Sequence, residues 1–346
     1  MTAKFIGYAG TYTRKTSEGI YRFVLDTEKE TLSKAEVAAK VGSPTYLTIS
    51  EDKKHLYSVA QDGEMGGVHA YELTEQTAEL SSINGQLVEG APPCHLDVKG
   101  GVLVTGNYHK GDIGLHQVGS NNEVEQGQFL KHEGSGPHDR QEKPHVHFTG
   151  YTPDGKYIVV ADLGTDKLVT YKQVKDELVH VNTLTVKEGS GPRHIAFHPN
   201  GKTAYLVTEL RSEVVVLDYD AATGSFTEKQ YIKAIPEDFT ETNDASAIHV
   251  SSDGKFVYSG NRGHNSIAVF AVNEETGELS LVEIKPSGGD WPRDFVLDPT
   301  GKFLVASNQH SGNIVLFKRD EVTGKLTQTD EVIDVPEVVC VKFLPE

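Results

Sequence analysis

A five-residue phrase recurs along this chain of 346 residues and limits the folds that it can adopt. Its copies are SEDKK (50–54), TPDGK (152–156), HPNGK (198–202), SSDGK (251–255) and DPTGK (298–302). The last four contain Asp-Gly, Asn-Gly or Thr-Gly, which are signals for tight hairpin turns. Their glycines recur at intervals of 46, 53 and 47 residues, so the sequence repeats a structural unit of about 50 residues.

Each repeat contains two hairpins and therefore four short strands. In one unit, IAF and TAYLVT flank the first turn, whereas VVVLDY and FTEKQYI flank a second turn, DAATGS. Long amphipathic helical periods are absent from the sequence. Four-stranded units that repeat every 40 to 50 residues or so are typical of a β-propeller.

The phrases that open the first strand of each unit count the blades. Six full units begin at Ser43, Pro93, Pro144, Pro192, Ala245 and Pro292. The N-terminal segment supplies three strands but no first strand, and the phrase from Pro336 supplies one lone strand, so pairing them completes a seventh blade. We expect an all-β, seven-bladed propeller with four antiparallel strands per blade, formed by residues 1–346 as one domain. Two β-sandwiches, the alternative fold, would leave the lone strand unused.

Polar and charged residues gather at one mouth of the predicted propeller. Because the first two strands of a blade pair antiparallel, the start of the first and the end of the second lie at the same end. The starts of the first strands contribute Thr45, Cys94, His95, His145, Arg193, Ser246, Arg293 and Glu337. The ends of the second strands contribute Thr11, Gln61, Asn107, Asp162, Glu209, Asn261, Arg262 and Asn308. The other mouth carries generic turn residues, so we expect the first mouth to hold the functional site.

The charge balance indicates what this mouth binds. The chain has 33 Lys and Arg residues against 50 Asp and Glu residues, a net charge of −17. So acidic a chain disfavours nucleic acid and anionic membranes as partners. Cations that converge on one mouth against this background favour an anionic ligand, because guanidinium groups match carboxylates and phosphates.

Cysteine usage and the N-terminal sequence indicate a location. Two cysteines, Cys94 and Cys340, are too few for a disulfide framework and fit a reducing compartment. The start, MTAKFIGYAG, does not have the pattern of a signal peptide, and no stretch approaches 18 apolar residues. We therefore expect a cytoplasmic protein, and the sequence leaves its oligomeric state open.

Other chemistries find less support in the sequence. His145 and His147 are two residues apart, so they would share a strand face and could chelate a metal. No second ligand cluster accompanies them, and we expect neither a metal nor a cofactor. The sequence also contains no G-x-S-x-G nucleophile motif.

Three segments resemble a known family. KPHVHFTGYTPDGKYIVVADLGTDKLVTY (143–171), GSGPRHIAFHPNGKTAYLVTEL (189–210) and SGNRGHNSIAVFAV (259–272) are similar to the seven-bladed lactonase family. That family includes the propeller type of 6-phosphogluconolactonase and the fungal carboxymuconate lactonizing enzyme. The resemblance implies a lactone hydrolase of the pentose phosphate pathway, acting on 6-phosphoglucono-δ-lactone. A muconate-type cycloisomerase and a non-enzymatic binding propeller are the alternatives.

The resemblance also implies catalytic residues. In the lactonizing branch these are a histidine, two arginines and a glutamate, which correspond here to His145, Arg193, Glu209 and Arg262. Arg293 competes for the role of the second arginine. We expect Glu209 or His145 to activate water, Arg193 to stabilise the oxyanion, and Arg262 and Arg293 to hold the anionic group of the substrate.

The neighbouring polar residues complete the expected site. PHVHF has two more residues before its turn than PRHIAF, which leaves the choice between His145 and His147 open. The expected substrate-binding residues are Arg293, His95, Asn107, His147, Asp162, His194 and Asn308.

Overall fold

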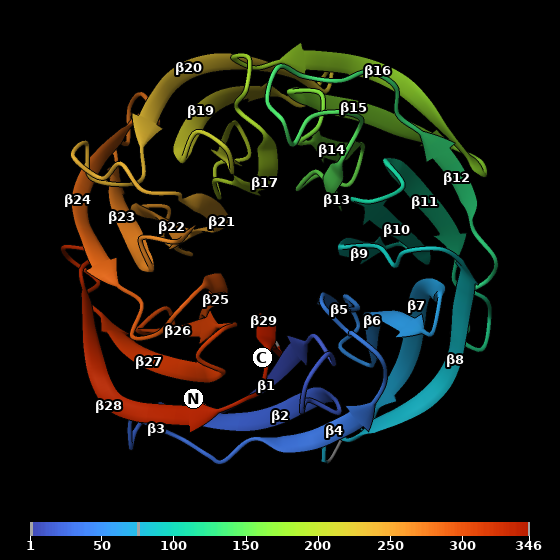
Figure 1. The fold of residues 1–346 in the computed structure, drawn as a ribbon, viewed down its shortest axis with the longest axis horizontal. Helices are drawn as coiled ribbons and strands as arrows, with labels where there is room; N and C mark the ends of the chain where they lie inside the picture. The colour runs from blue at the N-terminus through green and yellow to red at the C-terminus, as the bar shows by residue number, and fades with distance from the viewer. Residues whose placement is uncertain (1–2, 75–76, 345–346) are drawn as a thin grey trace.

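Seven sheets stand around a common axis in the computed structural model, which describes residues 3–74 and 77–344. Within these residues, 29 β-strands pair antiparallel and form the seven sheets. Figure 1 looks along the axis and shows the sheets as blades of a ring, with the chain running once around it. No helix in the described part of the chain is long and apolar enough to cross a membrane.

Six blades follow the chain order, and the first strand of each lies nearest the axis (Figure 1). The first three blades consist of β5 (Leu47–Ile49), β6 (His55–Asp62), β7 (Met65–Leu73) and β8 (Leu80–Glu89); β9 (His95–Lys99), β10 (Val102–Asn107), β11 (Asp112–Gln117) and β12 (Gln128–Lys131); and β13 (Val146–Tyr151), β14 (Ile158–Asp162), β15 (Lys167–Val174) and β16 (Glu177–Thr185). The next three consist of β17 (Pro192–Phe197), β18 (Thr203–Thr208), β19 (Glu213–Asp220) and β20 (Ser225–Lys233); β21 (Asp244–Val250), β22 (Phe256–Arg262), β23 (Ser266–Val272) and β24 (Leu279–Pro286); and β25 (Pro292–Leu297), β26 (Phe303–Asn308), β27 (Asn313–Arg319) and β28 (Leu326–Asp334).

The seventh blade joins the two ends of the chain. Its strands, from the axis outward, are β29 (Val338–Phe343), β1 (Lys4–Thr11) and β2 (Gly19–Asp26), followed by β3 (Thr31–Leu32) and β4 (Glu36–Lys40), which both pair with β2. Ala9 of β1 lies opposite Val341 of β29. This pairing confirms the seven-bladed propeller and its closure by the lone C-terminal strand, and it shows that the two-sandwich alternative is wrong.

Apolar side chains pack between the blades rather than around the axis. The described residues form seven buried clusters, each joining two adjacent blades. In the cluster that closes the ring, Phe23 and Phe343 of the seventh blade pack edge to face, with ring centroids 5.9 Å apart, beside Val305 of the sixth. Fully burying one such side chain contributes about 1.5–3 kcal/mol. Because the apolar faces are turned toward neighbouring blades, the axis is free for polar residues.

The repeated phrases form the turns between the first two strands of their blades. In TPDGK, Gly155 has a φ of 68° and its N–H donates to the carbonyl oxygen of Thr152 at 2.8 Å. The first copy, SEDKK, has no glycine, and Lys53 takes the same left-handed conformation with a φ of 61°. A side chain is strained in this region, so the first copy builds the common turn at a local cost.

Candidate active site

β-Bulges turn the side chains at the starts of several innermost strands toward the axis. His147 of β13, Arg193 of β17 and Arg293 of β25 each lie at a register shift, where the inner strand has one residue more than its partner. Ser246 lies at a similar shift in β21. A bulged residue is left out of the ladder and its side chain is redirected. The bulges therefore explain how a strand that enters the core can begin with an arginine.

The pairing register shows that His147 is the residue equivalent to Arg193. Both are the extra residue in their bulge, whereas His145 lies before β13 begins. The Nδ1 atom of His145 donates to the carbonyl oxygen of Tyr108 at 2.8 Å, and its Nε2 lies 3.1 Å from a carboxylate oxygen of Glu142. Its ring stacks on Tyr108 with centroids 4.2 Å apart. His145 thus packs against Tyr108, and of His145 and His147 only His147 lines the cavity.

The last paired residues of the second strands form hydrogen bonds with backbone groups of neighbouring loops. Asn107 accepts hydrogen bonds from the backbone of Lys110 and His109, and Asp162 accepts one from the backbone of Gly164. Asn308 donates to the backbone of the preceding loop. Asn107, Asp162 and Asn308 are buried and do not line the cavity, although the sequence predicted them to contact substrate.

The cavity residues of these strands lie one position later. Because side chains alternate along a strand, the residue after the turn-binding one points to the axis. The residues at this later position that line the cavity are Tyr12, Tyr108, Glu209 and Arg262. Of the residues predicted at the ends of the second strands, Gln61, Glu209 and Arg262 line the cavity, and both tyrosines were missed.

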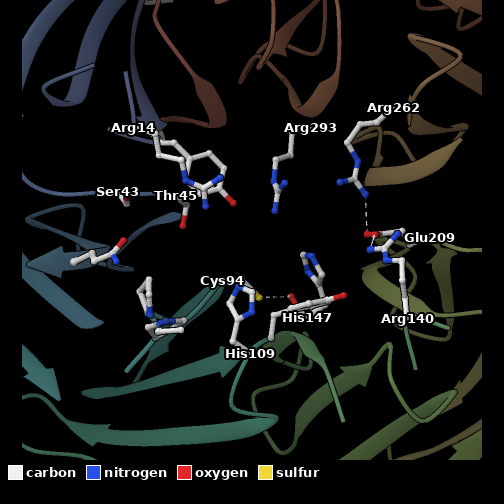
Figure 2. A pocket seen from close by; sticks show the side chains of 16 residues that line it. Arg14, Ser43, Thr45, Cys94, His109, Arg140, His147, Glu209, Arg262 and Arg293 are labelled. Carbon is white, nitrogen blue, oxygen red and sulfur yellow. Dashed lines mark hydrogen bonds and ion pairs between the residues drawn. The ribbon is translucent and has the colours of Figure 1, made fainter. Parts of the chain in front are cut away.

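A cavity of about 410 Å³ opens at this mouth (Figure 2). It is lined by Tyr12, Arg14, Ser43, Thr45, Gln61, Ala91, Pro92, Pro93, Cys94, Tyr108, His109, Arg140, His147, Glu209, Arg262 and Arg293. Four of these are arginines and one is a carboxylate. The cavity is therefore cationic in a chain of net charge −17.

Glu209 is the centre of an ion-pair network. Its Oε2 lies 2.9 Å from Nε of Arg193 and 2.7 Å from a terminal nitrogen of Arg262, and its Oε1 pairs with Arg140. Burial by itself raises the pKa of Glu209, but the Arg262 and Arg193 guanidiniums outweigh burial and hold the pKa well below its usual range. Both carboxylate oxygens are engaged and weakly basic, so Glu209 is better suited to orient cations than to remove a proton.

Arg140 was not predicted from the sequence because a long loop brings it to the site. It follows β12 of the second blade, yet its guanidinium pairs with Glu209 of the fourth blade and lies 2.9 Å from Oδ1 of Asp244 of the fifth. The next residue, Gln141, is fully buried and donates to the carbonyl oxygen of Leu163 and to Asp166. Gln141 thus holds the loop in place, and Arg140 extends from this loop to Glu209 and Asp244. No turn or repeat signal marks this contact.

Three histidine rings follow one another from the cavity into the interior. The rings of His147 and His194 have centroids 5.2 Å apart, and those of His194 and His95 lie 5.3 Å apart. Burial, followed by the charge of Arg193, holds the pKa of His147 and of His194 well below the usual range. Burial and the Lys342 charge lower the pKa of His95 to about 3. All three imidazoles are neutral at pH 7.

Only one of these three histidines reaches the cavity. His147 lines it, and its buried Nδ1 has no hydrogen-bond partner in the described chain. His194 lies one layer deeper, beside a small internal space that His147 and Arg193 also line. His95 packs between Tyr46 and Phe148. His95 and His194 were expected to contact substrate, but neither lines the cavity, and His147 lies between His194 and the cavity.

The cysteine at the cavity is not an activated thiol. Cys94 has the place in the second blade that Arg193 has in the fourth. Burial raises the pKa of Cys94 to about 11, so the thiol is protonated at neutral pH. Residues 3–74 and 77–344 contain no group of three or more His, Cys, Asp or Glu side chains arranged to hold a metal ion.

Comparison with known proteins places the chain among lactonases. The family model "Lactonase, 7-bladed beta-propeller" matches residues 6–343. The 6-phosphogluconolactonase of Bacillus subtilis is 49% identical over 344 residues, which cover 99% of each chain. The crystal structure of a Lactobacillus plantarum protein superposes with a TM-score of 0.94 at 40% identity, covering 98% of this chain and 99% of that one. The periplasmic gluconolactonase of Pseudomonas aeruginosa gives a TM-score of 0.94 at 28% identity, with 98% and 99% coverage.

Proposed function

Because this chain belongs to the lactonase family of seven-bladed β-propellers, we propose that it hydrolyses 6-phosphoglucono-δ-lactone. The observation that carries the proposal is the cationic cavity. Four arginines line it, although the whole chain has a net charge of −17. Guanidinium groups match a phosphate and also stabilise the oxyanion that forms when water attacks a lactone. The Bacillus relative supports the choice of substrate by its name.

His147 is the proposed general base. Its imidazole lines the cavity, is uncharged and has no ion pair with any described residue, so a ring nitrogen keeps a free lone pair for the proton of an attacking water. His145, the alternative, already uses both ring nitrogens on Tyr108 and Glu142. Glu209, the other alternative, has both oxygens in ion pairs with arginines.

The proposed reaction needs two proton transfers. Water adds to the lactone carbonyl carbon while His147 takes one of its protons, and Arg262 stabilises the oxyanion. The tetrahedral intermediate then collapses, the ring C–O bond breaks, and the imidazolium returns the proton to the departing alkoxide. The product is the open-chain hydroxy acid. Arg193 and Glu209 act by holding Arg262 and Arg140 in place rather than by contacting the reacting atoms.

A pair of histidine variants tests this assignment. Hydrolysis of 6-phosphoglucono-δ-lactone is followed for the purified protein and corrected for the spontaneous rate. His147→Gln is expected to lower kcat by about 10²–10⁴-fold, the usual contribution of a positioned base. His145→Gln is expected to cost about tenfold or less, since it only loosens Tyr108. A larger loss in His145→Gln than in His147→Gln would favour His145 as the base and overturn this mechanism. A wild-type rate no higher than the spontaneous rate would overturn the proposed function.

We propose a cytoplasmic location for the protein. Cys94 and Cys340 are both free thiols, as fits a reducing compartment. The Pseudomonas relative is described as periplasmic, so the location needs a direct test. Cell fractionation should recover the protein with cytoplasmic markers, and recovery from the periplasmic fraction would contradict the proposal.

A further inference from the structure

We propose that Arg14, Arg293 and Tyr12 form a phosphate subsite on the side of the cavity opposite Glu209. This inference rests on the proposed function and adds to it an orientation of the substrate. The phosphate of the sugar lactone binds at this subsite, and the lactone carbonyl lies between His147 and Arg262. Arg14, at a position that no motif in the sequence marks, then discriminates between phosphorylated and unphosphorylated lactones.

The loop that carries Arg14 is tied down on both sides of it. The backbone N–H of Tyr12 donates to the carbonyl oxygen of Glu337 at 3.1 Å. The N–H of Lys15 donates to the Glu337 carboxylate at 2.8 Å, and the N–H of Ser43 donates to Oγ1 of Thr13 at 3.0 Å. Arg14 is therefore presented to the cavity from a loop with a defined backbone, which lowers the entropy cost of binding an anion there.

Two guanidiniums flank one aromatic ring at this place. The guanidinium carbon of Arg14 lies 4.0 Å from the centroid of the Tyr12 ring, and that of Arg293 lies 5.5 Å from it. Across the described ranges, neither arginine side chain has an ion pair or a hydrogen bond. Arg140, Arg193 and Arg262 differ from them, because all three pair with Glu209. The cavity thus has one side whose arginines are paired with carboxylates and one whose arginines are not.

The unneutralised charge matches a phosphate monoester better than a carboxylate. Glu209 is the one acidic side chain among the described residues that line the cavity, and its charge is already shared among three arginines. Arg14 and Arg293 leave two positive charges for a ligand. A phosphate monoester carries about −1.5 to −2 at pH 7, whereas a carboxylate carries a single charge.

The order of the blades separates the two sides of the cavity. Arg14 belongs to the seventh blade and Glu209 follows β18 of the fourth, which is the largest separation that a ring of seven blades allows. Figure 2 shows Arg14 and Glu209 on opposite sides of the cavity. A ligand that contacts both sides must carry its anionic group far from its reacting carbonyl. A phosphate on the terminal carbon of a sugar lactone meets this requirement.

The test compares Arg14→Gln with a matched control, Arg211→Gln. Arg211 follows the same strand as Glu209 and pairs with Glu213 at 3.0 Å, outside the cavity lining. The readout is the ratio of kcat/KM for 6-phosphoglucono-δ-lactone to that for glucono-δ-lactone, each corrected for the spontaneous rate. Arg14→Gln is expected to lower this ratio by about 10- to 100-fold, mainly through KM, as for loss of a hydrogen bond between charged groups. Arg211→Gln is expected to leave the ratio unchanged.

A binding measurement separates this inference from the proposed function. Isothermal calorimetry measures the affinity of the wild type and of both variants for glucose 6-phosphate, glucose and glucuronate. If the wild type hydrolyses no lactone but binds glucose 6-phosphate, and Arg14→Gln alone weakens this binding by about tenfold, the subsite stands and the function fails. A ratio or an affinity that Arg14→Gln leaves unchanged overturns the subsite. Glucuronate binding as tight as glucose 6-phosphate binding overturns its assignment to phosphate.

Discussion

Mild acid should destabilise this propeller through the three histidines below its cavity. His95, His147 and His194 are buried, and their pKa values in the folded protein lie below the ordinary value. In the unfolded chain each has a pKa of about 6.5. The unfolded state therefore binds more protons below pH 6.5, and stability is present above this pH and lost as the pH falls.

The size of the effect follows from proton linkage. Each histidine that stays neutral in the folded protein lowers the free energy of unfolding by about 1.4 kcal/mol between pH 7.5 and 5.5. Three such histidines give about 4 kcal/mol over this interval. A typical domain is stable by about 5–15 kcal/mol, so the loss is a large part of the total.

Equilibrium urea unfolding at pH 7.5, 6.5 and 5.5 measures this slope. His194→Gln should reduce the dependence on pH by about a third, whatever it does to the stability at pH 7.5. His180→Asn, at an exposed position on β16, is the matched control and should leave the slope unchanged. A free energy of unfolding that is flat between pH 7.5 and 5.5 would refute the reasoning. A slope that His194→Gln does not change would show that the protons bind elsewhere.

Three further predictions follow from the site and the turns. Glu209→Gln should lower kcat/KM by about 100-fold or more, because three guanidiniums lose their shared anion, and circular dichroism should show the fold retained. For unphosphorylated glucono-δ-lactone, kcat/KM corrected for spontaneous hydrolysis should be flat from pH 8 to about 6, since the lowered pKa keeps His147 neutral there; a loss centred on pH 6.5 would contradict this. Lys53→Gly should raise the free energy of unfolding by about 0.5–1 kcal/mol by relieving a positive φ, whereas Lys156→Gly, just after the glycine of the second copy, should not stabilise; a stabilisation of equal size in both would point to a cause other than the turn.

The fold could be predicted from the sequence because its signals are local. Each turn phrase builds its hairpin from neighbouring residues, and Gly155 shows the left-handed conformation that such a turn needs. The lone strand after Pro336 and the incomplete N-terminal blade required each other, and β29 pairs with β1 as expected. Repetition of one local unit multiplies a weak signal, so seven blades could be counted before any contact was known.

The register of the site could be predicted only in part. Arg193, Arg262, Arg293 and Glu209 line the cavity or hold its ion pairs, as the sequence indicated. His147 rather than His145 lines the cavity, because a bulge inserts one residue and changes which side chain faces the axis. A one-residue change reverses every side-chain direction in a strand, and the sequence does not mark where the bulge lies.

The amino-acid sequence by itself determined the blades, the ring closure and the mouth at which cations gather, since these depend on turns and alternation within one unit. The tertiary structure alone decided which cations are ion-paired. Arg140 reaches Glu209 from a loop 69 positions earlier, whereas Arg14 and Arg293 meet around Tyr12 from opposite ends of the chain and keep their charge for a ligand. Ion pairing is set by the distance between blades, and closing the ring sets that distance.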